Sequence, residues 1–108
     1  MKEKEKDVAV RIMNQFRDRG SMVYELRHEG SRFAIVTSQR TSGEDPNEWQ
    51  VRVRVAGQPA ESSVERWGST RIDALRAVAQ VWRDEPAGWL SRLDWEAVEK
   101  ALLAVRAL

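Results

Sequence analysis

The clearest helix in the chain is WGSTRIDALRAVAQVWR, residues 67–83. Ser69 or Thr70 can cap its first N–H groups, and Asp73 puts a carboxylate near the positive end of the helix dipole. Apolar residues then recur at spacings of three and four along one face: Ile72, Leu75, Val78, Ala79 and Trp82. Pro86 and Gly88 follow and end the helix. The stretch therefore predicts a helix that lies across a sheet and covers its core.

Upstream of this helix, the apolar residues alternate with a period of two, which is typical of strands. Residues 22–27 and 32–38 flank a turn at 28–31 and predict a hairpin. Residues 49–55, WQVRVRV, form the most regular strand pattern, and residues 61–67 predict a short further strand. The polar segment 40–48 between them has the composition of a loop.

Two further segments show helical spacing. Residues 7–19 begin with Asp7, end before Gly20, and place apolar residues on one side: Val8, Ile12, Met13 and Phe16. Asp94 can cap a last helix with an apolar stripe of Trp95, Val98, Leu102 and Val105. We therefore expect helices at both ends of the domain.

The composition predicts one globular domain. The chain has 108 residues with 42% hydrophobic and 32% charged content, and it contains no cysteine. We expect a flexible lead-in at residues 1–6 and a single α+β domain at 7–108, with element order α-β-β-β(-β)-α-α. Its core would be an antiparallel meander of three or four strands with the helices packed on one face. The lack of cysteines, of a membrane-spanning run and of a signal-peptide core favours a cytoplasmic protein without membrane partners.

A search for catalytic chemistry gives little. His28 is the only histidine and falls at a predicted turn, so no His/Cys metal set can form and serine has only this one base. The glycine-containing stretches match neither phosphate-loop nor dinucleotide fingerprints. We predict no catalytic residue, no metal and no cofactor, and therefore no enzyme.

Arginines suggest a binding surface. Of the 18 basic residues, 14 are arginine, although the net charge is only +1. If the strands turn their valines toward the helices, a set of arginines shares the open sheet face: Arg27, Arg32, Arg40, Arg52 and Arg54. This face could bind a phosphate backbone or an acidic protein surface. Alternatively, these side chains keep an open sheet soluble, and this interpretation is favoured.

Tryptophans and the last helix suggest protein contacts. Trp67 and Trp89 lie at element ends, where each could anchor a partner or pack between sheet and helices. The stripe from Trp95 to Val105 could pack on its copy in a symmetric dimer, or the helix could fold back on its own sheet. The second alternative is slightly favoured.

The order of elements over residues 7–84 resembles that of the double-stranded-RNA-binding domain, α–β–β–β–α. The corresponding segments are the first helix, the YELRHEGSRF hairpin, the WQVRVRV strand and the GSTRIDALRA helix start. The resemblance implies RNA contacts at the start of the second helix, where the family has a lysine-rich turn. At those positions this chain has Arg71, Ile72 and Leu75, so only Arg71 is basic.

The sequence therefore favours a non-enzymatic binding or adaptor domain whose partner is a protein, including a second copy of itself. The alternative is a nucleic-acid-binding domain that uses the arginine-rich sheet face or the start of the central helix.

Overall fold

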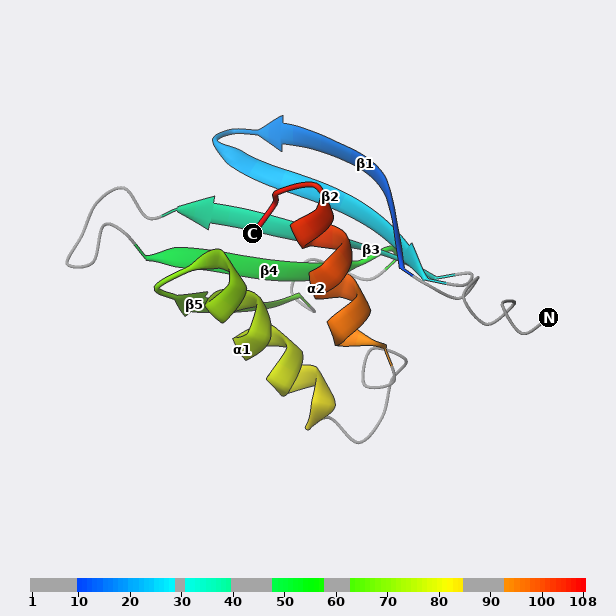
Figure 1. Ribbon diagram of the computed structural model, residues 1–108. Helices are drawn as coiled ribbons and strands as arrows, with labels where there is room; N and C mark the ends of the chain where they lie inside the picture. Colours follow the sequence, from blue (N-terminus) through cyan, green and yellow to red (C-terminus); the bar gives the residue numbers. More distant parts are fainter. Residues whose placement is uncertain (1–9, 29–30, 40–47, 58–62, 85–92) are drawn as a thin grey trace.

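A computed structural model of the chain describes residues 10–28, 31–39, 48–57, 63–84 and 93–108. Within these ranges, five strands form one antiparallel sheet in the order β1-β2-β3-β4-β5, and two helices follow (Figure 1). The elements are β1 Arg11–Asp18, β2 Ser21–His28, β3 Ser31–Gln39, β4 Trp49–Val55, β5 Val64–Gly68, α1 Arg71–Arg83 and α2 Trp95–Ala104. The predicted α+β class and antiparallel meander with helices on one face are confirmed. The sheet has one strand more than the largest number predicted.

The predicted first helix is wrong, because residues 11–18 form strand β1, paired antiparallel with β2. Arg19 and Gly20 connect the two strands with positive φ angles of 54° and 87°. Two consecutive residues in this region give the type I′ turn that suits a two-residue hairpin. Gly20 therefore serves the hairpin, although a glycine with positive φ is equally typical of a helix end. Consequently, the α–β–β–β–α order behind the RNA-binding resemblance is not the order of this chain.

The core lies between the sheet and the two helices. Strand residues Tyr24, Leu26, Ile35, Val51 and Val53 are buried there in one cluster, together with residues of both helices. The helix residues of that cluster are Ala74, Leu75, Val78, Ala79, Trp95, Val98 and Leu102. The period-two pattern of β2 to β4 thus identified the core face correctly.

Helix α1 begins as the sequence predicts. The Thr70 hydroxyl accepts a hydrogen bond of 3.1 Å from the Asp73 N–H, which caps the first turn. Gly68, the last residue of β5, lies directly beneath that turn, since a Cβ added there would come within 2.6 Å of the Ala74 nitrogen. Arg71 places its guanidinium carbon 4.6 Å from the centre of the Trp49 ring, a cation–π contact between α1 and β4.

Helix α2 folds back on its own sheet. The Asp94 carboxylate accepts from the Ala97 N–H at 3.2 Å, as predicted, and Trp95, Val98 and Leu102 are buried. The helix ends at Ala104, and the Ala107 N–H donates to the Leu102 carbonyl at 2.8 Å. Arg106, just before Ala107, has a positive φ of 60°, as is common after a helix end. Ala107 itself is completely buried in the core cluster.

An ion pair joins the two helices on their outer side. The Arg76 guanidinium donates to both carboxylate oxygens of Glu99, at 3.0 and 2.9 Å. These hydrogen bonds, and then the positive charge of Arg76, lower the pKa of Glu99, while its partial burial acts in the opposite direction. The carboxylate therefore stays ionised below the usual range of a glutamate, and α2 remains linked to α1.

Candidate binding face

The sheet face turned away from the helices is here called the open face. Cross-strand partners point to the same side, so the register fixes which residues it carries. They are Arg11, Asn14, Phe16 and Asp18 of β1, Ser21, Val23, Glu25 and Arg27 of β2, Arg32, Ala34, Val36 and Ser38 of β3, Gln50, Arg52 and Arg54 of β4, and Glu65 and Trp67 of β5. Among these strand residues, five arginines stand against three carboxylates, so the face is moderately basic.

At one end of the open face, three arginines are direct cross-strand neighbours. Arg11 pairs with Arg27, and Arg27 pairs with Arg32. We call this row the arginine ladder. All three side chains are exposed. Like charges directly opposite each other in a sheet repel, so this row is the most basic part of the open face.

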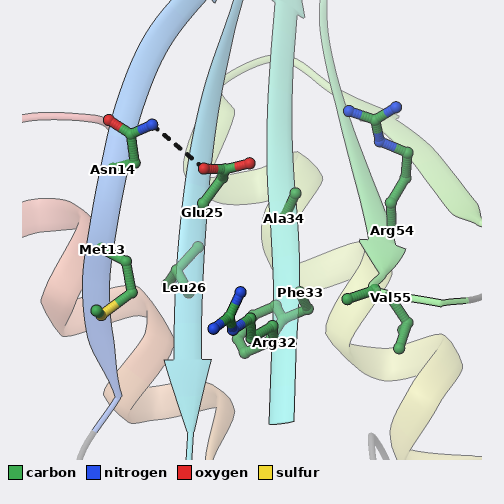
Figure 2. A pocket seen from close by; sticks show the side chains of 10 residues that line it. Met13, Asn14, Glu25, Leu26, Arg32, Phe33, Ala34, Arg54 and Val55 are labelled. Carbon is green, nitrogen blue, oxygen red and sulfur yellow. Dashed lines mark hydrogen bonds between the residues drawn. The ribbon is translucent and has the colours of Figure 1, made fainter.

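Next to the ladder lies a depression of about 620 Å³ (Figure 2). Ala34 is small and lies between the longer side chains of Glu25 and Arg54, its neighbours on β2 and β4. Arg32 lines one end, and Asn14 donates to the Glu25 carboxylate at 3.3 Å across the other. Within the part of the chain that the structure describes, Arg32 and Arg54 have no hydrogen-bond or ion-pair partner. Both guanidinium groups are thus available to a ligand.

An apolar row crosses the middle of the open face. Phe16, Val23 and Val36 are successive cross-strand neighbours on β1, β2 and β3. Val23 is only 2% exposed, although neither described helix covers this side of the sheet. Phe16 itself remains 40% exposed. The apolar surface that the row presents to solvent therefore comes from Phe16 and in part from Val36, and the row of Asn14, Glu25 and Ala34 separates it from the arginine ladder.

On β4 and β5 the open face is already internally paired. The Arg52 guanidinium donates through Nε to the Glu65 carboxylate at 2.9 Å. Trp67, at the far edge on β5, is 38% exposed. Arg52 is therefore less available to a ligand than Arg32 and Arg54.

The structure brings together four of the predicted binding residues, because Arg27, Arg32, Arg52 and Arg54 all lie on the open face. Trp67 shares that face at its edge. Arg71 does not, since it contacts Trp49 on the side that faces the helices. Arg40 and Trp89 lie outside the described residues.

The residues predicted for self-association have another role. Trp95, Val98 and Leu102 are at most 3% exposed in the core of their own chain, so they cannot form a surface while the chain is folded. Val105 lies beyond the end of α2 and is 41% exposed. The alternative prediction, that the last helix packs on its own sheet, describes the structure.

Sequence reasoning missed the contribution of β1, namely Arg11, Met13, Asn14 and Phe16. The spacing of their apolar neighbours predicts a helix, in which Arg11 and Phe16 would not join the sheet. The usable signal was the turn DRGS, residues 18–21, because two residues with left-handed backbone close a hairpin as readily as they end a helix.

The described residues contain no group of three His, Cys, Asp or Glu side chains placed to hold a metal ion. No helix in the described part of the chain has the length and apolar character needed to cross a membrane. Comparison of the chain with protein-family models, with curated proteins and with solved structures finds no match.

Proposed function

We propose that this chain is a non-enzymatic binding domain that docks another protein on its open face. The observation that supports this most is that exposed Phe16, half-buried Val36 and the arginine ladder share the open face, with the row of Asn14, Glu25 and Ala34 between them. Neither described helix covers this face. Protein interfaces typically combine an apolar centre with a polar rim in which arginine is common. A cytoplasmic location belongs to the same proposal and is supported by the absence of cysteine.

The charges on the open face indicate an acidic partner. The arginine ladder and Arg54 supply guanidinium groups, which bind carboxylates through two parallel hydrogen bonds. Arg32 and Arg54 have no hydrogen-bond or ion-pair partner among the described residues, so a carboxylate would bind these two guanidinium groups first. The favoured partner is therefore a protein segment that carries both carboxylates and apolar side chains.

A nucleic-acid partner is the second candidate, and the observation that favours it is the ladder together with exposed Phe16 and Trp67. Arginines can bind phosphates, and aromatic rings on a sheet can stack on unpaired bases. The carboxylates of Asp18, Glu25 and Glu65 on the same face repel phosphates and acidic protein segments alike, so the preference for a protein partner depends on the apolar side chains of the face.

A residue-resolved NMR titration separates the two candidates. The probes are a peptide of alternating Glu and Leu, a single-stranded oligonucleotide and a short RNA duplex, each added at low salt. We expect the peptide to shift the amides of β1 to β3 on the open face and the nucleic acids to shift them less. Stronger binding of an oligonucleotide, with affinity falling steeply as salt rises, would instead support the second candidate.

The matched variants use exposed arginines. The double substitution Arg27→Ala and Arg32→Ala removes two rungs of the ladder and should abolish the peptide shifts while the domain stays folded. Arg83→Ala at the end of α1 removes an exposed charge on the helical side and should leave the shifts unchanged. If none of the probes binds, or if the two variants behave alike, the open face is not the docking site.

A further inference from the structure

Strand β1 is an edge strand whose outer side is not paired with any described strand. In the sheet order it neighbours β2 alone. Seven of its eight residues are exposed, and only Ile12 is half-buried. Met13 and Phe16 are 56% and 40% exposed, although large apolar side chains are usually placed where they are covered. An edge of this kind is a template for another strand.

The hairpin fixes which backbone groups of β1 point outward. In a two-residue hairpin the closing pair, here Asp18 and Ser21, is hydrogen-bonded, and bonded pairs then alternate along the ladder. Phe16 and Val23 thus form the next bonded pair, while the N–H and C=O groups of Gln15 and Arg17 face away from β2. In agreement, the Gln15 N–H donates to the Asn14 side-chain oxygen at 3.0 Å instead of to a strand.

We propose that this edge pairs antiparallel with the same edge of a second copy, with Phe16 on the two-fold axis. The proposal does not rest on the docking of an acidic partner. A two-fold axis between the two β1 strands keeps both open faces on the same side only when one residue lies opposite its own copy. The candidates for this central residue are Gln15, Phe16 and Arg17. Each centre makes a different set of contacts.

Charge and packing select Phe16. A centre at Arg17 would put two arginines directly opposite each other, which is destabilising. A centre at Gln15 would bring Met13 into the pairing, and the register between β1 and β2 is shifted there by a bulge. With Phe16 at the centre, the two phenyl rings meet across the axis, and Asn14 lies opposite Asp18 of the copy.

The same register gives hydrogen-bond partners to the backbone groups of β1 that face outward. Gln15 lies opposite Arg17 of the copy, so the N–H and C=O groups that face outward meet in a bonded pair on each side of the axis. The Gln15 N–H exchanges its local bond to the Asn14 side chain for a strand bond. The segment from Asn14 to Asp18, whose register with β2 is unbroken, carries the pairing, and two five-stranded sheets join into one.

The chain contains no cysteine, so engineered disulfides report the register directly. Residues opposite each other in a non-bonded pair have Cα atoms about 4.5 Å apart, within the disulfide range. Phe16→Cys should therefore form a covalent dimer under mild oxidation. Asn14→Cys is the control, because its two copies would lie roughly 13 Å apart along the strands and should not cross-link.

A second variant tests the backbone bonds. Gln15→Pro removes an N–H that faces outward and is not part of the β1–β2 ladder, so the fold should persist. Sedimentation equilibrium should give twice the chain mass of 12.4 kDa for the natural sequence and a single mass for this variant. A natural chain that stays monomeric at millimolar concentration overturns the proposal. So does equal cross-linking of the two cysteine variants, or a dimer that Gln15→Pro leaves intact.

Discussion

Replacement of Leu102 by alanine tests whether α2 stabilises its own chain. Leu102 is completely buried against the sheet, and Leu→Ala substitutions at such sites cost about 2–5 kcal/mol through lost burial and the cavity left behind. We expect a loss of about 3 kcal/mol in the free energy of unfolding. For a domain of this size, the melting temperature should fall by roughly 12–24 °C.

The matched control is Leu103→Ala, one residue along the same helix. Leu103 is 45% exposed, so its replacement should change the free energy of unfolding by no more than about 0.5 kcal/mol. Both variants and the natural chain are unfolded in urea and followed by far-UV circular dichroism, at several protein concentrations. The difference between the variants should be the same at every concentration, because Leu102 packs within one chain. A difference that vanishes on dilution would refute the reasoning, since it would place Leu102 in an interface between copies.

Three further results are expected. Gly68→Ala should lower the free energy of unfolding by about 1–3 kcal/mol in urea titrations, because the new Cβ would come within 2.6 Å of the Ala74 nitrogen; an unchanged midpoint would contradict this packing. The pKa of Glu99 is lowered by Arg76, so the pair adds stability above the usual carboxyl pKa and loses it as pH falls through the lowered value. When the free energy of unfolding is measured at decreasing pH, Glu99→Gln should therefore lose less stability than the natural chain. Equal losses in the two proteins would contradict a stabilising Arg76–Glu99 ion pair. Arg19→Asn should raise the melting temperature slightly, because asparagine tolerates the left-handed backbone found there; a decrease would speak against the type I′ turn.

The part of the binding face that the sequence predicts lies on strands with one buried and one exposed side. In β4 the valines alternate with polar residues, and in β3 Phe33, Ile35 and Thr37 take every second position, so knowing the core face also gives the open face. For this reason Arg32, Arg52 and Arg54 could be grouped from the sequence. What the sequence did not indicate is that Glu65 already holds Arg52, because that contact depends on the register between β4 and β5.

Strand β1 could not be predicted in the same way. An edge strand that is exposed on both faces does not need to alternate apolar and polar residues. In addition, the bulge at Met13 interrupts the period-two pattern of β1. Its apolar residues fall at spacings that also fit a helix. Only the pairing with β2 across the turn at Arg19 and Gly20 selects the strand, and with it Arg11 and Phe16 join the open face.

The sequence by itself determined the two helices after the sheet, a cap at Ser69 or Thr70 for the first and at Asp94 for the second, and the core side of the central strands. Each of these depends on spacing within one segment. The tertiary structure decided the rest. Burial of Leu102 in its own chain and the strand form of residues 11–18 depend on which surfaces meet in space. Free energies of packing and pairing between distant segments exceed the small local preferences that a single segment expresses.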